Sequence, residues 1–417
     1  MPIRAERLAD DIAAIARCTG SPGAGADRPT FSPAWRAARD YCVGEAERAG
    51  CRWRVDAAGN VHIRPAAVDW SSRVWMSGSH VDSVPHGGDF DGVVGVVAAL
   101  EALRGAHEDG RHDLPLEAVI FAEEEGTTFG LGMLGSRGWA GTLDATALAA
   151  LRNRAGLTYW EAGGDHGAAA DRLAGEGLRS GAYAGFLEVH IEQGPAMWKR
   201  DERVALVTAI NGRRQYALTL RGVANHAGST GMNDRHDALA GAAEVIAAVE
   251  CLPDTLGPHA VATVGRIAVE PNAINVIPAS AAFTIDLRAS NDHDLETGDS
   301  RIRALAAAAA ARRGLEVSVH RTESLPAVGL DPHVAACVRE AAARLGMPPL
   351  PETASGALHD AAILAPLVPT VMLFVASRDG ISHNPAEFSR IEDVAVATRL
   401  LAEVVAAVPD PLAATRS

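Results

Sequence analysis

Histidine and aspartate lie close together in one glycine-rich stretch of the sequence. His80, Asp82 and Asp91 fall within residues 78–92, which directly follow an apolar run that begins at Val74. A second apolar run comes next, so this order predicts a buried strand, a loop and then a helix. Ligands of open α/β sheets bind beyond the carboxyl ends of the strands. We therefore expect this loop to carry chemistry.

Three other apolar runs also end beside acidic or imidazole side chains. In chain order these side chains are Glu124 and Glu125, His190, and His383. Imidazole together with carboxylate suits zinc, manganese, cobalt or nickel, whereas an all-oxygen set favours magnesium or calcium. One carboxylate can bridge two metal ions, and of two adjacent glutamates one can bind metal while the other moves protons. These residue types predict a metal site.

Each of these pieces alone also has a structural explanation. A histidine after a strand is more often structural than a ligand, and a run of three glutamates usually forms a solvated surface. Asp89 and Asp91 can cap the helix that follows them. The occurrence of four such pieces, each at the end of a predicted strand, favours the metal site over these alternatives.

Length and composition set the broad class of the protein. A chain of 417 residues favours two domains. The net charge of -14 argues against nucleic-acid binding and against attraction to a membrane surface. The five cysteines form no CxxC pair, the N-terminus lacks a signal peptide, and no apolar run approaches the roughly 20 residues that span a bilayer. The sequence therefore predicts a cytoplasmic protein.

The predicted elements before residue 211 belong to a larger α/β part. Helices are expected over 5–17 and 33–49, and strands over 52–56, 61–64, 74–76, 116–122 and 185–191. The larger part resumes after Pro326, with a helix over 332–345, a strand over 370–375, a helix over 391–407 and a frayed tail from 409. The sequence thus predicts a catalytic domain made of residues 1–210 and 327–417.

A smaller part is inserted between these segments. Its strands are expected over 215–221, 260–269, 281–288 and 315–321, and its helices over 237–251 and around 305–313. The order β-α-β-β-α-β is a complete split unit that can fold on its own sheet. The sequence therefore predicts an inserted ferredoxin-like domain over residues 211–326.

Several longer motifs in the chain carry a family resemblance. They are GSHVDSVPHGGDFDGVVGV, EEEG, GMLGSRGWAG, EVHIEQGP, NHAGSTGM, PNAINVIP, FTIDLR and GISHNPAEF. With them the chain resembles the family of N-carbamoyl-L-amino acid hydrolase, allantoate amidohydrolase and β-ureidopropionase, within the clan of di-metal aminoacylases and carboxypeptidases. The resemblance implies an exopeptidase-like catalytic domain with an inserted domain that serves as a lid and joins a homodimer.

The resemblance also implies a set of metal ligands. His80 and His190 would bind one divalent metal ion, Glu125 and His383 the other, and Asp91 would bridge the two. Zinc, manganese, cobalt or nickel fits this set of donors.

Three further residues take implied roles in catalysis. Asp82 would orient His80, and Glu124 would be the general base that moves a proton from water to the leaving amine. His226 would polarise the scissile carbonyl in the active site of the other subunit of the dimer.

Four residues have implied contacts with the substrate. Asn275 and Arg288 match substrate-binding positions, and a guanidinium group suits a carboxylate because it can form two parallel hydrogen bonds. Gln193 would contact an amide or ureido group, and Gln215 is a further candidate. Structural alternatives remain for two of these positions and for His226: a surface ion pair for Arg288, a turn for Asn275 and a loop cap for His226.

Five positions depart from the family's pattern. Thr127-Thr128 stand where relatives carry Ser-Arg, Gly231 replaces a proline, and Leu358 and Asp379 each replace a glycine. These changes spare the implied metal ligands and fall on implied pocket walls. The chemistry is therefore expected to be intact, while the choice of substrate stays open.

The predicted reaction is hydrolysis of a linear amide or ureido C–N bond in a small carboxylate substrate. An N-carbamoyl-L-amino acid is the first expected substrate and allantoate the second. Alternatives are an N-acyl amino acid hydrolase or peptidase and, from another class, a catalytically silent dimeric binding protein. The presence of Glu124 argues against a silent protein, because a binder has no need of a base beside the ligand Glu125.

Overall fold

The computed structural model describes residues 1–407, so the frayed tail predicted from residue 409 lies outside the described residues. The chain divides into two compact units. The first comprises Met1–Thr208, Leu330–Thr353 and the chain from His359 onward, and the second comprises Ala209–Gly329 and Ala354–Leu358. Helices and strands alternate through the chain, which makes this a mixed α/β fold.

Most of a nine-stranded sheet lies in the first unit. Its order is β1-β2-β4-β3-β5-β15-β6-β13, with β14 beside β6. The strands are β1 (Cys51–Val55), β2 (Val61–Pro65), β3 (Val74–His80), β4 (Leu116–Phe121), β5 (Tyr183–Ile191), β6 (Val204–Ile210), β13 (Val328–Gly329), β14 (Glu352–Ser355) and β15 (Thr370–Val375). The inner strands β4, β3, β5 and β15 run parallel, so their carboxyl ends meet at one edge of the sheet.

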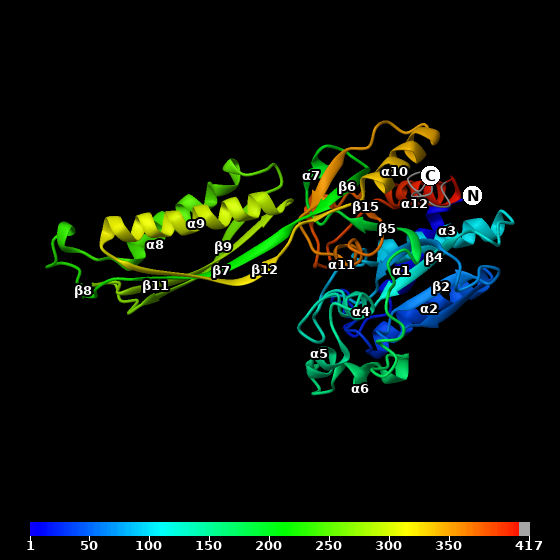
Figure 1. Cartoon of the computed structure of the whole chain (residues 1–417), viewed down its shortest axis with the longest axis horizontal. Helices are drawn as coiled ribbons and strands as arrows, with labels where there is room; N and C mark the ends of the chain where they lie inside the picture. The colour runs from blue at the N-terminus through cyan, green and yellow to red at the C-terminus, as the bar shows by residue number, and fades with distance from the viewer. Residues whose placement is uncertain (408–417) are drawn as a thin grey trace. The chain divides into compact units, whose positions relative to one another are not determined.

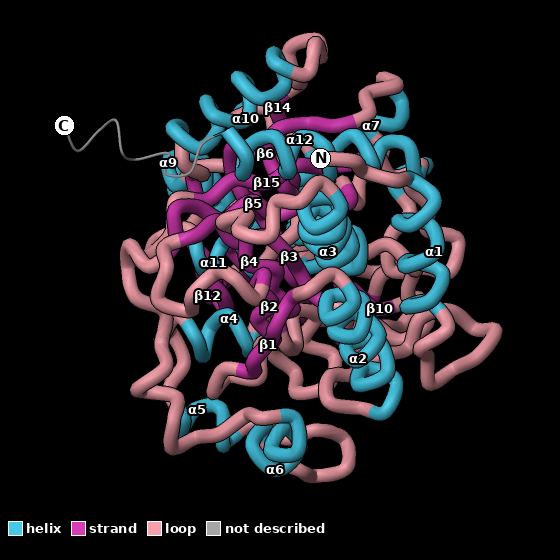
Figure 2. Tube along the Cα trace, turned by 90° about the vertical axis from the view of Figure 1, so that its right-hand side faces the viewer, coloured by secondary structure: helices cyan, strands magenta, loops and turns pink. Residues whose placement is uncertain are grey.

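Helices cover both faces of this sheet. Figure 2 shows α1, α2 and α3 along one side of the strands and α4 and α11 on the other. The helices are α1 (Ala5–Ala16), α2 (Pro33–Arg48), α3 (Val93–Glu108), α4 (Leu134–Trp139), α5 (Ala145–Ala150), α6 (Tyr159–Gly163), α7 (Ala196–Lys199), α10 (Pro332–Arg344), α11 (Asp360–Leu364) and α12 (Ile391–Ala407), with short 3₁₀ turns at Gly164–His166 and Arg378–Gly380. Because both faces are covered, β3, β4, β5 and β15 are buried along their whole length.

The second unit has its own antiparallel sheet, ordered β12-β7-β11-β9. Its elements are β7 (Gly212–Arg221), β8 (Asn225–His226), α8 (Ala238–Glu250), β9 (Val261–Glu270), β10 (Val276–Ile277), β11 (Ser280–Ala289), α9 (Asp292–Arg313) and β12 (Glu316–Leu325), with 3₁₀ turns at Met232–Asp234 and Leu252–Thr255. Figure 1 shows α8 and α9 side by side on one face of this sheet. Alternate residues of β7 and β11 point into the core beneath these helices, among them Leu218, Phe283 and Leu287.

Most predicted elements are present, with boundaries that differ by a few residues. The predicted strand over 74–76 extends to His80, so His80 ends the strand and does not lie in the loop. Five strands were missed: β6, β13 and β14 in the larger sheet, and the two-residue strands β8 and β10. None of the helices within residues 1–407 is long and apolar enough to cross a membrane.

Candidate metal centre

The carboxyl edge of the parallel strands collects the predicted ligands of the first unit. His80 is the last residue of β3, and it lies opposite Phe121, the last residue of β4. His190 lies opposite Phe374 near the ends of β5 and β15. The parallel pairing therefore brings residues from distant parts of the chain to one edge.

Two groups of donor atoms meet there, and they share Asp91. One group is His80, Asp91 and His190, and the other is Asp91, Glu125 and His383; within each group the donor atoms lie within 4.8 Å of one another. Asp91 Oδ1 is 3.2 Å from His190 Nε2, and Asp91 Oδ2 is 3.1 Å from His383 Nε2. The two oxygens of one carboxylate thus face different groups, as a bridging ligand would.

Glu188, His190 and His359 form a third group of possible ligands. The oxygens of Glu188 already accept hydrogen bonds, one from the Ser79 hydroxyl at 2.7 Å and one from the backbone N–H of Ala361 at 3.2 Å. The ring of His359 stacks edge-on against His190 at 4.4 Å between centroids. His359 therefore packs against the ring of His190, while Glu188 is held by Ser79 and Ala361.

Two backbone carbonyls fix the tautomers of the buried histidines. His80 Nδ1 donates to the carbonyl oxygen of Asp82 at 3.0 Å, and His190 Nδ1 donates to the carbonyl of Ile191 at 3.0 Å. Each ring therefore turns Nε2 toward the other ligands, and in its neutral form keeps the lone pair of Nε2 available to a metal ion. The carboxylate of Asp82, predicted to orient His80, lies 3.7 Å from Nδ1, and its Oδ2 accepts from the backbone N–H of Glu125 at 3.1 Å.

Negative charge is concentrated in this buried site. Burial raises the pKa of Glu124 well above its usual value, and nearby Glu125, Asp360 and Asp82 raise it further. Burial and Asp91 raise the pKa of Glu125 to about 8. A cluster of acidic side chains with raised pKa values is expected at a cation site, because a bound cation would compensate the negative charge of the carboxylates. The donor set and this charge fit a site for divalent metal ions.

Asp91 behaves differently from the neighbouring acids. Burial opposes its ionisation, but hydrogen bonds from His190 and His383 outweigh burial and hold its pKa well below the usual range. Asp91 is therefore a carboxylate at neutral pH, which is the form a bridging ligand needs.

Gln193 also contacts Asp91. Its Nε2 donates to Asp91 Oδ2 at 2.8 Å. Among residues 1–407 its buried Oε1 has no hydrogen-bond partner. Gln193 therefore presents an unused acceptor at the centre, suited to an N–H group of a ligand.

Glu387 and Ser382 were not among the predicted site residues. Glu387 Oε1 accepts from the backbone N–H groups of Phe90 and Asp91 at 2.9 and 3.0 Å, and Ser382 Oγ donates to Glu387 Oε2 at 2.9 Å. Glu387 thereby holds the loop that carries Asp91. The sequence did contain a signal for it, since Glu387 lies four residues after His383 in the motif HNPAEF.

The predicted substrate residues other than Gln193 lie in the second unit, in two places. His226 and Asn275 are brought together by the β8–β10 pair, and His226 Nδ1 accepts from the backbone N–H groups of Gly228 and Ser229 at 3.1 Å each. The proton of the ring therefore sits on the exposed Nε2, which can donate to a ligand.

The other place is built around Asp286. Arg288 Nε and Gln215 Nε2 both donate to its carboxylate, at 2.9 Å each. Arg288 Nη1 also donates to the carbonyl of Gly356 at 2.8 Å. Arg288 thus takes part in an ion pair, the structural alternative for this position, while Nη2 has no protein partner within residues 1–407.

Comparison with known proteins decides the family. Residues 76–407 match the peptidase family M20/M25/M40. The chain belongs to this family. An N-carbamoyl-L-amino acid amidohydrolase from Geobacillus stearothermophilus is 37% identical over 410 residues, covering 97% of this chain and 98% of the relative. An allantoate amidohydrolase from Bacillus subtilis (strain 168) is 32% identical over 403 residues, covering 95% and 96%.

Solved structures agree with this assignment. An amidase of the hydantoinase/carbamoylase family from Burkholderia multivorans superposes with a TM-score of 0.89 at 35% identity, covering 97% of each chain. The predicted family is therefore confirmed, and the chain is a hydrolase of the M20/M25/M40 family, whose members are generally metal-dependent.

Two positions at which this M20/M25/M40 member departs from its relatives lie beside the centre. The Thr128 hydroxyl accepts from the backbone N–H of Thr30 at 2.9 Å, and the backbone N–H of Thr128 donates to Glu123 at 2.8 Å. The Thr127 hydroxyl lies 3.4 Å from the carbonyl of Ser83. These short side chains are bound to the protein itself, where a longer basic side chain could reach a ligand.

Proposed function

We propose that the chain is a two-metal amidohydrolase that cleaves the ureido C–N bond of an N-carbamoyl-L-amino acid. One observation carries the proposal: Asp91 joins two groups of ligand atoms, with the buried acid Glu124 beside them. The relatives from Geobacillus stearothermophilus and Paenarthrobacter aurescens, both named N-carbamoyl-L-amino acid amidohydrolases, support the substrate class.

In this proposal His80, Asp91 and His190 hold one ion, and Asp91, Glu125 and His383 hold the other. Zinc, manganese, cobalt and nickel fit these nitrogen and oxygen donors. When bound, the ions polarise a carbonyl group and lower the pKa of water.

Glu124 is the proposed general base. Its Oε2 lies 3.7 Å from His80 Nε2, so its carboxylate faces the same group of ligands as His80. A cation next to Glu124 favours its ionised form and so opposes the pKa rise that burial causes. Glu124 then takes a proton from the attacking water and delivers it to the nitrogen that leaves. Water adds to the carbonyl carbon and one C–N bond breaks, which leaves an amine and a carbamic acid. The carbamic acid then loses carbon dioxide, so the final products are ammonia, carbon dioxide and the amino acid.

The second unit is the proposed lid and dimerisation domain, of ferredoxin-like type. His226 Nε2–H would donate to the oxygen on which negative charge develops, in the active site of the partner subunit. The free Nη2 of Arg288 would bind the substrate carboxylate, with Asn275, Gln193 and Gln215 as further polar contacts.

The substrate panel that tests this function has three members. Metal-loaded protein is incubated with an N-carbamoyl-L-amino acid, with allantoate and with the N-acetyl form of the same amino acid, and product release is followed. We expect ammonia from the N-carbamoyl compound at the highest kcat/KM. A higher kcat/KM for allantoate would make allantoate the substrate, the compound in the name of the Bacillus subtilis relative. Cleavage of the N-acetyl compound without ammonia from the other two would overturn the proposal.

A further inference from the structure

A hollow lies in the first unit, where β2 ends and β5 begins. Its cavity volume is about 430 Å³, within the usual range for a small-molecule site. Tyr183, in its lining, is the first residue of β5, whereas His190 lies seven residues further along this strand. At about 3.3 Å per residue the two ends are roughly 23 Å apart, so the hollow is separate from the metal centre.

The floor of the hollow is a buried, charge-balanced cluster. Glu117 accepts from His62 Nδ1 at 2.8 Å, from Arg64 Nε at 2.5 Å and from the Tyr183 hydroxyl at 2.7 Å. Asp56 lies 3.1 Å from His62 Nε2. Two cationic and two anionic side chains thus satisfy one another, and Arg64 is not available to a ligand.

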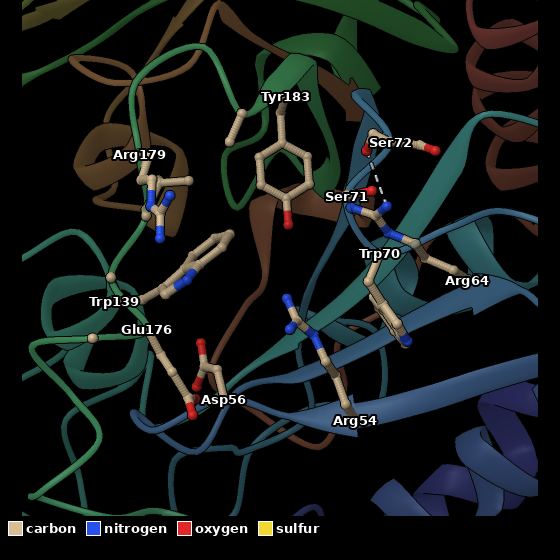
Figure 3. A pocket seen from close by; sticks show the side chains of 14 residues that line it. Arg54, Asp56, Arg64, Trp70, Ser71, Ser72, Trp139, Glu176, Arg179 and Tyr183 are labelled. Atoms are coloured by element: carbon tan, nitrogen blue, oxygen red, sulfur yellow. Dashed lines mark hydrogen bonds between the residues drawn. The ribbon is translucent and has the colours of Figure 1, made fainter.

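The rim, by contrast, carries uncompensated positive charge. Within residues 1–407, the guanidinium groups of Arg54 and Arg179 make neither a hydrogen bond nor an ion pair with the protein. The one acid of the rim, Glu176, is already paired with Arg172 at 2.7 Å. Figure 3 shows the Arg54 and Arg179 side chains on opposite sides of the hollow. An anion is the ligand that this pair of guanidinium groups suits.

The walls are aromatic. Trp139 is packed edge-on against Tyr183, at 5.7 Å between ring centroids, and against His62, at 4.9 Å. Trp70 lies under the guanidinium group of Arg54 at 4.6 Å. Rigid rings beside free guanidinium groups favour a ligand with a flat body, because ring stacking and cation–π contacts act on such a body.

We propose that this hollow binds a flat organic anion, an aromatic ring that carries a carboxylate or phosphate group. The acidic group lies between Arg54 and Arg179, and the ring packs against Trp139. The site is independent of the metal centre and of the hydrolysis proposed for it.

Isothermal titration calorimetry tests the proposal on the full chain. The probes are benzoate, phenyl phosphate, inorganic phosphate and the neutral benzamide. We expect benzoate or phenyl phosphate to bind, and the stronger of the two identifies the acidic group; benzamide and inorganic phosphate should bind at least tenfold more weakly. The double variant Arg54→Gln/Arg179→Gln should lose at least tenfold in affinity. Arg154→Gln, an exposed arginine outside the hollow, is the matched control and should bind as the wild type does.

Equal affinity in the double variant and in Arg154→Gln would overturn the proposal, as would equal binding of benzoate and benzamide. A crystal soaked with 4-bromobenzoate gives a second, variant-free measurement. An anomalous bromine peak beside Trp139 supports the site. A peak found only at the metal centre, or no peak, contradicts it.

Discussion

Glu387 illustrates how a single side chain sets the geometry of the metal centre. It is almost completely buried, and its three hydrogen bonds go to the backbone N–H groups of Phe90 and Asp91 and to Ser382. None of these contacts reaches a substrate. Glu387 is therefore a positioning residue that acts through Asp91.

The variant Glu387→Gln removes the charge of this side chain and keeps its shape. We expect metal affinity to fall by about 10–100-fold, because Asp91 loses its support. Glu392→Gln, an exposed acid in the first turn of α12, is the control and should bind metal as the wild type does. Competition with a chelating dye measures both affinities. An unchanged metal affinity in Glu387→Gln would show that Glu387 does not position Asp91.

The types and order of the proposed ligands were readable from the sequence, but their supports were not. His80 and His190 stand out because each follows or ends an apolar run, and Asp91 because it lies in the glycine-rich loop after His80. The stacking of His359 on His190 and the backbone contact of Glu387 join residues 169 and 296 positions apart. Such contacts arise from tertiary packing, and nothing in the local sequence announces them.

At the scale of elements, the parallel strands were predicted because each is a continuous apolar run, buried on both faces. The antiparallel strand β6 was missed, although its residues are apolar, because its partners β15 and β14 are more than 100 residues away. The strand β6 forms because it pairs with strands that are distant in the sequence, and a local sequence pattern cannot predict such pairing.

Gly78 allows β3 to approach β4. Its φ is +151°, and a Cβ atom there would lie 1.9 Å from the carbonyl oxygen of Val119. We expect Gly78→Ala to lower the free energy of unfolding by about 3 kcal/mol or more, since this clash is with backbone. Gly44→Ala in α2 meets nothing within 4 Å and should instead stabilise by about 0.5–1 kcal/mol. Urea unfolding measures the free energy of unfolding of both variants. A Gly78→Ala variant as stable as the wild type would contradict the close approach of β3 to β4.

The buried pair His62 and Glu117 links β2 to β4 through charge. Burial lowers the pKa of His62, but Glu117 and Asp56 outweigh burial and raise it to about 9. A histidine whose pKa is raised in the folded state contributes its full stabilisation below its pKa in the unfolded state, near 6.5. This stabilisation is lost as the pH rises through 9. We expect the free energy of unfolding to fall by on the order of 2 kcal/mol between pH 6.5 and 9.5.

His62→Gln isolates this contribution. It should be less stable than the wild type at pH 6.5 and should approach the wild type at pH 9.5, when both are unfolded by urea. A wild type whose stability stays level over this range, or a variant with the same pH dependence, would show that His62 is not charged in the folded protein.

For the whole molecule, the proposed dimer makes a prediction that a monomer does not. Glu124→Gln and His226→Ala should each be inactive alone, because one lacks the base and the other the donor to the oxyanion. If His226 acts in the partner's site, a mixed dimer contains one intact site. Refolding the two variants together should then restore roughly a quarter of the wild-type activity, from the statistics of a twofold dimer. No recovery would place His226 in the site of its own subunit or outside the site.

The proposed hydrolysis is measured as ammonia release from an N-carbamoyl-L-amino acid, with wild type and Glu124→Gln compared at equal metal content. We expect steady turnover by the wild type. The rate of Glu124→Gln should be at least about a hundredfold lower, since a general base contributes this much or more. Equal rates for the two proteins, or no ammonia from the metal-loaded wild type, would contradict the proposed hydrolysis.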